Sequence, residues 1–409
     1  MMRLWRSPTL RTAVVYGAGG VGFTGANLIL ARVLPAAEYG LLTLVVALVN
    51  LGYSLAPMGV DGVVNRQPLE AGPQLLRRVL LFSFLVALGF AALGALAYEM
   101  SYGLVAMILL SVTAGGGLQV ASAKFQSEQR YGPSLGLLQS SNLVFLVAAL
   151  VTVLAGMREA WPALLISTFG WLAGAGWGWS VLLRERHAKP ERDVEFSMGE
   201  ALSYAGVQAT GLILIQLERL VLPHLLPLRD LATFGVLAAI AGSLFRVLQM
   251  GTAFTLVPRL RAAPDVRQRR RLVAKEARLV SAVVLLGCAA IWIATPLLER
   301  WFLAGKYHLA GSLVLATLVS GVAKVFNAFT KSTAAALADP RELSLLNLLG
   351  WISLGVGLAG AVVGARWGLA GVIYGVTAGW LVRAFTALSI AARHLRIPVA
   401  EPTAEPAPS

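Results

Sequence analysis

The chain has 409 residues, of which 57% are hydrophobic and only 13% are charged, and its formal net charge is +14. A soluble protein of this length could not bury so much apolar surface in one core, so the composition excludes an ordinary soluble domain. The basic excess falls mostly in gaps between apolar runs, where it faces anionic lipid head groups, and nucleic-acid binding is not expected.

Twelve apolar runs of about 20 residues follow one another along the chain, each long enough to cross a hydrocarbon layer of ~30 Å. They cover residues 12–34, 39–64, 79–98, 102–123, 134–156, 160–183, 201–223, 231–257, 279–298, 309–333, 342–364 and 368–392. We therefore predict an all-α, polytopic membrane protein of about 12 transmembrane helices.

The placement of the 34 lysines and arginines sets the orientation. Twenty-four fall in gaps on the side of the N-terminus and six on the other side, which by the positive-inside rule puts both termini in the cytoplasm. Four lie within the apolar runs, namely Arg219, Arg246, Lys324 and Arg383. The gaps on the outer side are too short for an external catalytic domain, so an enzyme is not expected.

A polar segment at 184–199 divides the runs into two sets of six. We expect one lobe at 1–183, a second at 200–397 and a disordered Pro/Ala-rich tail at 398–409. Two sets of six would share one orientation, as parallel repeats do. A short echo supports this relation, because Tyr39-Gly40 opens the second run and Phe234-Gly235 opens the eighth.

Neither a metal site nor a cofactor site is expected. The four histidines are scattered and Cys288 is the only cysteine. The run Gly17–Gly22 fits a dinucleotide fingerprint, but it lies inside an apolar run without the strand that this motif needs. Small residues in such a run favour close packing of helices instead.

The run 309–333 carries the clearest polar stripe. Steps of three and four residues place one set of side chains on a single helix face: Thr317, Ser320, Lys324, Asn327 and Lys331. A charge at the bilayer centre costs about 2.5–3.5 kcal/mol, so the stripe should line a wet cavity or a helix interface. Alternatively, Lys331 extends to the surface and only Lys324 is buried. Arg246 and Gln249 make a second cavity candidate.

Other candidates lie nearer the helix ends. Glu218 and Arg219 form either a tie between helices or a gate. Asn50, Ser54 and Asp61 share one face of the second run, where Pro57 should kink the helix, although Asp61 could also be solvated and inert. In the second half, five basic residues face the single carboxylate of Glu218, which predicts a cavity of positive potential suited to phosphate.

The segment LILARVLPAAEYGLLTLVVALVNLGYSLAPMGVDGVVNR resembles the first two spans of polysaccharide flippases in the multidrug/oligosaccharidyl-lipid/polysaccharide exporter superfamily. The matching residues are Arg32, Tyr39, Gly40, Gly59 and Arg66. The segment LIQLERLVLPHLLPLRDLATFGVLA resembles a later region of the family, with Glu218-Arg219 where Asp-Arg is usual and matches at Gly235 and Pro258. Near the end, ARWGLAGVIYG resembles a third family element.

This resemblance implies two six-helix lobes around a central cavity that works by alternating access in a bacterial inner membrane. It implies a polyprenyl-diphosphate-linked oligosaccharide as substrate, moved to the outer leaflet for cell-surface polysaccharide and O-antigen assembly. Arg246 and Lys324 would bind the anionic head group. The other expected sites are Gln249, Asn327 and Lys331 in the cavity, Asn50, Ser54 and Asp61 for sugar or head group, and Glu218, Arg219 and Arg32 for gating or ion coupling.

Expected partners are the lipid-linked oligosaccharide, membrane lipids and polysaccharide polymerase machinery, with the protein itself a monomer. One alternative is a cation-coupled multidrug exporter of the same superfamily. Against it, the first run has no acidic residue between Arg11 and Glu38. A membrane-embedded glycosyl-transfer enzyme is the third alternative, and it lacks both a long outer loop and a suitable acid pair.

Overall fold

The computed structural model describes residues 8–66, 69, 71–186, 198–263 and 265–396. Throughout that part the chain is helical and contains no strand, which confirms the all-α prediction. Most of the segment 184–199 and the tail 398–409 lie outside the described residues. The proposed lobe boundaries therefore remain a prediction.

Twelve long helices and one short one make up the described chain. Their bounds are α1 (Pro8–Val33), α2 (Ala36–Leu55), α3 (Val60–Arg66), α4 (Pro73–Ala97), α5 (Tyr102–Ser127), α6 (Tyr131–Leu154), α7 (Trp161–Arg186), α8 (Met198–Leu225), α9 (Leu228–Ala262), α10 (Val266–Leu297), α11 (Gly311–Leu337), α12 (Pro340–Gly364) and α13 (Gly368–Arg396). A short turn of helix, η2 (Leu298–Phe302), follows α10, and η3 (Ala365–Trp367) precedes α13. Each predicted apolar run coincides with one long helix, except that the second run also includes the short α3.

The second predicted span is interrupted. It ends as α2 at Leu55 and resumes as α3 at Val60, with Pro57 in the break. Met58 and Gly59 there have φ values of 48° and 82°, which a continuous right-handed helix cannot contain. The prediction that Pro57 disturbs this helix is confirmed. The prediction that Asp61 shares a helix face with Asn50 and Ser54 is wrong, because Asp61 lies beyond the break on α3.

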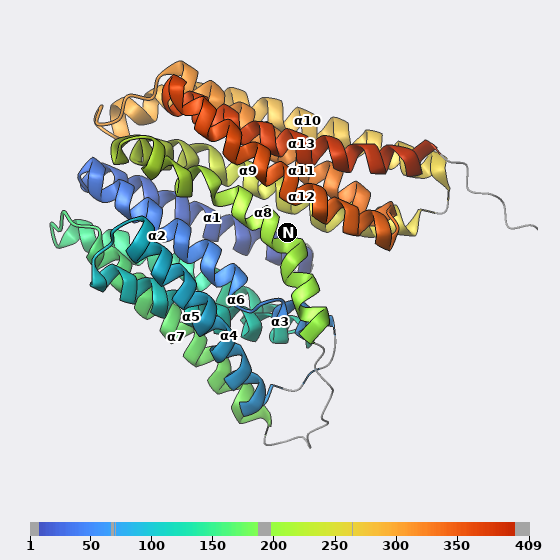
Figure 1. Cartoon of the computed structure of the whole chain (residues 1–409), viewed down its shortest axis with the longest axis horizontal. Coiled ribbons are helices and arrows are strands. Elements are labelled where there is room, and N and C mark those ends of the chain that lie inside the picture. Colours follow the sequence, from blue (N-terminus) through green and yellow to red (C-terminus); the bar gives the residue numbers. More distant parts are fainter. Residues whose placement is uncertain (1–7, 67–68, 70, 187–197, 264, 397–409) are drawn as a thin grey trace, which may run out of the picture.

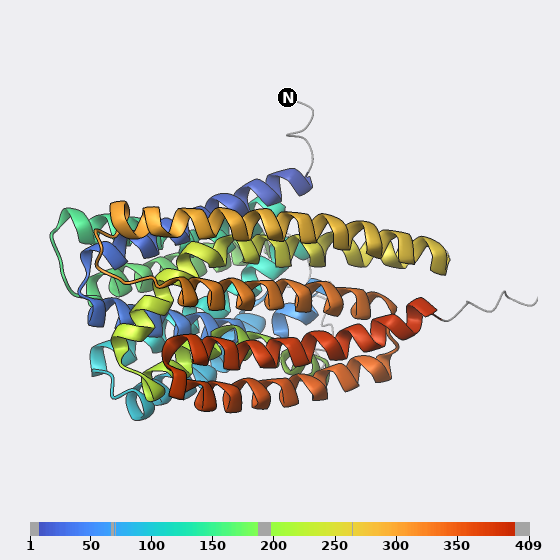
Figure 2. The same ribbon diagram turned by 90° about the horizontal axis from the view of Figure 1, so that it is seen from above.

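The helices form two groups, as Figure 1 shows. Helices α1–α7, called the N-terminal bundle here, pack mainly on one another, and α8–α13, the C-terminal bundle, do the same. The bundles lie close together at the end where α1 meets α2, called the distal end. They spread apart towards the opposite end, called the terminal end, where α1 begins and α13 ends (Figure 1). Figure 2 shows the long α10 along one side of the molecule.

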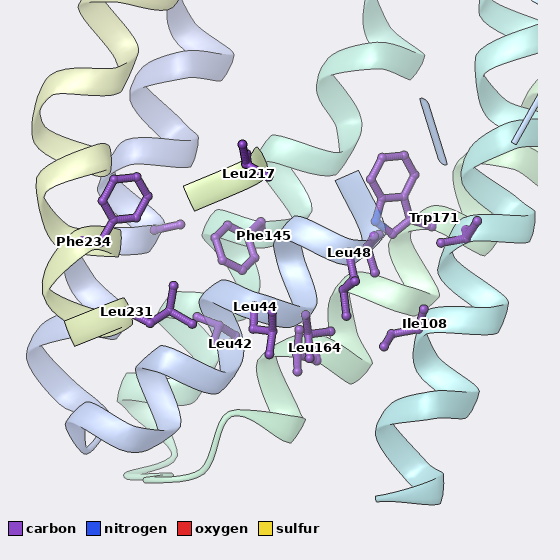
Figure 3. Close-up of a cluster of buried hydrophobic side chains, with 14 of the residues drawn as sticks. Leu42, Leu44, Leu48, Ile108, Phe145, Leu164, Trp171, Leu217, Leu231 and Phe234 are labelled. Atoms are coloured by element: carbon purple, nitrogen blue, oxygen red, sulfur yellow. The ribbon is translucent and has the colours of Figure 1, made fainter. Parts of the chain in front are cut away.

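One continuous hydrophobic core joins the two bundles. Leu42, Leu44 and Phe145 of the N-terminal bundle lie near Leu231 and Phe234 of the C-terminal bundle (Figure 3). Away from this interface, α4 and α10 expose leucines such as Leu85 and Leu286. Seven of the described helices are apolar and long enough to cross a membrane by strict criteria of length and composition.

The two aromatic-glycine pairs of the sequence meet at the interface between the bundles. A Cβ atom on Gly40 would lie 2.6 Å from the Leu228 carbonyl oxygen at the start of α9. A Cβ atom on Gly235 would lie 3.2 Å from the Tyr39 ring. Both glycines therefore permit the close crossing of α2 and α9. The glycine run of α1 is likewise inside a helix, where Gly19 packs on Gln139 of α6.

Candidate functional site

A buried ion pair lies inside the C-terminal bundle. The Lys324 ammonium of α11 donates to Glu218 Oε1 of α8 over 2.8 Å, and Glu218 is 1% exposed. The same ammonium lies 5.9 Å from the centre of the Trp380 ring on α13. The sequence predicted that Lys324 lines the cavity and binds the anionic head group. The structure instead places its charge against the one carboxylate that this bundle buries among the described residues.

The polar stripe of α11 faces the helices packed around it. Ser320 and Asn327 are buried between α11 and its neighbours α9 and α13. In the described part of the protein, three buried atoms here have no hydrogen-bond partner: Ser320 Oγ, Asn327 Oδ1 and Glu218 Oε2. Buried polar atoms are nearly always paired in folded proteins, so these three atoms make the interior of the C-terminal bundle polar at this position. Lys331, one turn further, is exposed.

A second group of charges joins α8 and α9. Arg219 donates to Gln216 Oε1 over 2.7 Å, and its guanidinium lies 5.9 Å from the Phe234 ring. The exposed Arg246 lies near enough for its charge to act on Arg219. Among the described residues, neither arginine forms an ion pair within 4 Å, although the charge of the neighbouring Glu218 carboxylate also acts on Arg219. Gln249 follows Arg246 by one turn and is half-buried.

Arg383 is a further cation that the sequence could not assign. It is 7% exposed, and its Nη1 has no hydrogen-bond partner among the described residues. Its guanidinium packs on α8 at Gly211, where a Cβ atom would lie 3.3 Å from Nη2. Its charge also acts on Lys331 of α11. The C-terminal bundle thus holds two pairs of like charges, Arg219 with Arg246 and Lys331 with Arg383.

The polar residues of the N-terminal bundle separate into two places. Asn50 lines a pocket between α1, α2, α5, α6 and α7, together with Ser141 and Asn142. Ser54 hydrogen-bonds the Asn50 carbonyl oxygen over 2.7 Å and does not line this pocket. Asp61 lies apart on α3 and accepts a hydrogen bond from Gln119 over 3.4 Å.

At the distal end a lysine of the C-terminal bundle caps a helix of the N-terminal bundle. Lys306, between η2 and α11, donates to Ala31 O over 2.8 Å and also contacts the carbonyls of Arg32 and Leu34. The carbonyls at a helix C-terminus have no partner within the helix and carry partial negative charge. Burial lowers the pKa of the Lys306 ammonium, and these carbonyls replace the water that burial removes.

Further contacts between the bundles surround Lys306. Tyr307 donates to Ala31 O over 3.1 Å, and its ring lies 6.3 Å from that of Tyr39. Arg32, predicted as a gating residue, lies 5.6 Å from the Phe302 ring of η2. No pattern in the sequence marks Lys306, because it resembles any loop lysine and its partners are more than 270 residues away. We call Lys306, Tyr307 and the end of α1 the distal latch.

No protein-family model matches the sequence, and no curated protein matches it. Solved structures do match. An inward-facing multidrug resistance MATE family transporter of the MOP superfamily aligns with TM-score 0.60 at 11% identity over 94% of this chain and 98% of that one. The lipid II flippase MurJ in an inward closed conformation aligns with TM-score 0.59 at 9% identity over 93% of this chain and 87% of that one. A point mutant of the Vibrio cholerae MATE transporter VcmN aligns with TM-score 0.56 at 15% identity over 95% of this chain and 96% of that one.

These likenesses establish the fold. The chain is a multi-pass membrane protein with the twelve-helix architecture of these transporters, as the apolar helices predicted.

Proposed function

We propose that the protein is a lipid flippase that moves a polyprenyl-diphosphate-linked oligosaccharide, or a related glycolipid, from the cytoplasmic to the outer leaflet. Its fold is shared with transporters, among them one described as a lipid II flippase. The distribution of basic residues would place the terminal end in the cytoplasm. The membrane would be a bacterial inner membrane, as the resemblance to polysaccharide flippases implies. Cell-surface polysaccharide assembly, with polymerase machinery as a downstream partner, would use the product.

The two pairs of like charges in the C-terminal bundle carry this proposal. The charges of Arg219 and Arg246 repel each other, and the Glu218 carboxylate that also acts on Arg219 is already hydrogen-bonded to Lys324, so an anion between the two arginines would offset the repulsion. The same reasoning applies to Lys331 and Arg383. Guanidinium groups bind phosphate oxygens through two parallel hydrogen bonds, so a diphosphate head group suits these sites. Gln249 lies on α9 with Arg246, and Asn327 lies on α11 with Lys331. Both amides would add neutral hydrogen bonds to the head group.

Alternating access would use the two ends of the molecule in turn. The distal latch and Arg32 join the bundles at the distal end, while the bundles diverge at the terminal end (Figure 1). This arrangement suits a state that admits substrate from the terminal end. The Glu218–Lys324 pair would act within the bundle as a gating or coupling element and not as the head-group ligand.

Transbilayer movement of a fluorescent, short-chain polyprenyl-diphosphate glycolipid tests the proposal. Purified protein in vesicles should expose the inner-leaflet lipid to an external quencher. Arg246→Gln should slow this movement about tenfold or more, since a hydrogen bond to a charged group contributes about 1.5–3 kcal/mol. Arg158→Gln, an exposed change in the loop after α6, should leave it unchanged. Equal rates in protein-free vesicles and in vesicles containing the protein would refute the proposal.

A cation-coupled multidrug exporter is the competing function, because two of the matching structures described above are MATE transporters. A cationic drug needs a carboxylate that is free to bind it. In the described C-terminal bundle, Glu218 is committed to Lys324, and the residues lining the N-terminal pocket include no acid. Accumulation of a cationic dye in the same vesicles, without movement of the diphosphate lipid, would reverse this ranking.

A further inference from the structure

We infer that the outward face of α10 binds anionic phospholipid head groups in the leaflet at the terminal end. This inference goes beyond the proposed function and does not depend on which substrate is carried. Helix α10 runs along one side of the molecule, and its first turns lie at the terminal end (Figure 2). One face of this helix is basic in those turns and apolar in the turns that follow.

The basic part of the face is a stripe of four cations. Steps of four, four and three residues place them on one side of the helix: Arg267, Arg271, Lys275 and Arg278. All four residues are exposed. Within the part of the chain that the structure describes, none of them has a carboxylate within 4 Å. The four charges are therefore open to a ligand from outside the protein.

The acidic residues of the same turns are already engaged. Asp265 caps the start of α10, where its side chain accepts a hydrogen bond from the Gln268 N–H over 2.6 Å. Glu276 forms an ion pair with Arg259 at the end of α9. Neither carboxylate is paired with a cation of the stripe, so the positive charge of this face is not cancelled locally.

The other two arginines of these turns hold α10 to the protein. Arg269 donates to the Ala263 carbonyl oxygen over 3.1 Å, and Arg270 donates to the Leu395 carbonyl oxygen of α13 over 2.5 Å. These contacts attach the first turns of α10 to the C-terminal bundle. They leave the stripe on the side of the helix that faces away from it.

Beyond Arg278 the exposed face becomes apolar. Leu279 is 59% exposed and Leu286 is 73% exposed. At a rise of 1.5 Å per residue, the stretch 279–297 is about 28 Å long, which matches a hydrocarbon layer of ~30 Å. Trp301 of η2 is exposed just past the other end of this stretch, and tryptophan is enriched at membrane interfaces. The apolar turns therefore contact lipid tails and place Arg278 at the boundary with the head groups.

The depth of each cation follows from the same rise. Lys275 lies about 6 Å beyond Leu279 along the axis, which is within a head-group layer ~5–7 Å thick. Arg271 and Arg267 lie about 12 and 18 Å beyond Leu279. Attraction to an anionic surface falls off within a Debye length of about 8–10 Å. Arg278 and Lys275 therefore bind head groups directly, and the two outer arginines add a weaker attraction.

A phospholipid fits this face better than a soluble acidic protein does. A lipid whose chains lie along the apolar turns carries its phosphate to the level of Arg278 and Lys275. One molecule thus contacts both parts of the face, whereas a soluble partner would contact only the basic part. Phosphatidylglycerol has a net negative charge and gains from the cations, but zwitterionic phosphatidylcholine gains little.

Quenching by brominated lipids tests the inference in a bilayer. A fluorophore at Ala282→Cys, an exposed position one turn from Arg278, reports the lipids beside the stripe in a Cys288→Ala background. The full-length protein is placed in phosphatidylcholine vesicles that contain brominated phosphatidylglycerol or brominated phosphatidylcholine. We expect phosphatidylglycerol to associate about tenfold more strongly at this position, because two cations lie in the head-group layer.

Variants assign the preference to the stripe. It should disappear when all four cations are neutralised by Arg267→Gln, Arg271→Gln, Lys275→Gln and Arg278→Gln. Lys275→Gln/Arg278→Gln should remove most of it, and Arg267→Gln/Arg271→Gln should remove little. The matched control loses four exposed cations at the distal end and should keep the preference: Arg158→Gln, Arg229→Gln, Arg300→Gln and Arg366→Gln. Thermal melting of each variant verifies that it is folded.

Three results would overturn the inference. One is equal association of the two lipids with the wild type. Another is an equal loss of preference in the distal variant, which would reveal a general effect of net charge. The third is a preference that depends on Arg267 and Arg271 but not on Lys275 and Arg278, which would point to a soluble acidic partner. None of these measurements uses transport, so failure of the proposed function would leave their outcome unchanged.

Discussion

Replacing Lys324 by methionine should strongly destabilise the C-terminal bundle. The Nζ–Oε1 distance of 2.8 Å corresponds to an attraction of about 6 kcal/mol at an effective dielectric constant of about 20. Most of that attraction offsets the desolvation of the two groups. Removing only the lysine leaves the Glu218 carboxylate, 1% exposed, without a counter-charge, which costs about 3–5 kcal/mol.

A double-mutant cycle isolates this coupling. Lys324→Met, Glu218→Gln and the double variant are compared with the wild type by thermal unfolding in detergent. We expect each single variant to melt at a lower temperature and the double variant to recover most of the loss, because no isolated charge remains. Additive losses, with the double variant the least stable, would refute the view that Glu218 and Lys324 chiefly neutralise each other.

Two further predictions concern the contacts between the bundles. Lys306→Met removes the ammonium from the α1 carbonyls and should loosen the contact between the bundles. A thiol placed at the buried α2–α9 crossing by Thr43→Cys, in a Cys288→Ala background, reports this loosening. It should react faster with a membrane-impermeant maleimide when Lys306 is methionine. Lys306→Arg, which keeps the positive charge, is the control. An equal labelling rate with lysine and with methionine at position 306 would show that Lys306 does not hold the bundles together. Gly40→Ala should lower the melting temperature, because its Cβ would lie 2.6 Å from the Leu228 carbonyl oxygen, whereas Gly89→Ala, with open space around it, should not. Equal effects of the two substitutions would show that the α2–α9 crossing tolerates a side chain.

The helices could be predicted from the sequence because their signal is local. Each apolar run of spanning length became one long helix, and Pro57 marked the one predicted span that is divided. The contact between the two halves was also visible locally in the sequence, because the two aromatic-glycine pairs, Tyr39-Gly40 and Phe234-Gly235, meet at the α2–α9 crossing. A close helix crossing requires small residues, and small residues are visible in a sequence.

The site was predictable only in part, because partners distant in sequence decide it. The sequence located Lys324 and Glu218 within spans, but their pairing depends on how the folded bundle brings α8 and α11 within reach, across 106 residues of sequence. Arg383 near the end of a run resembled a side chain that reaches the surface, yet Gly211 gives it a place inside the bundle. Lys306 had no distinguishing neighbour at all.

The affinity of the purified protein for farnesyl diphosphate tests most directly whether the paired cations form an anion site. We predict that the Arg219→Gln/Arg246→Gln variant binds farnesyl diphosphate about 100-fold more weakly than the wild type, from the loss of charged hydrogen bonds. Uncharged farnesol should bind the two proteins equally. Undiminished diphosphate affinity in a correctly folded double variant would contradict the account.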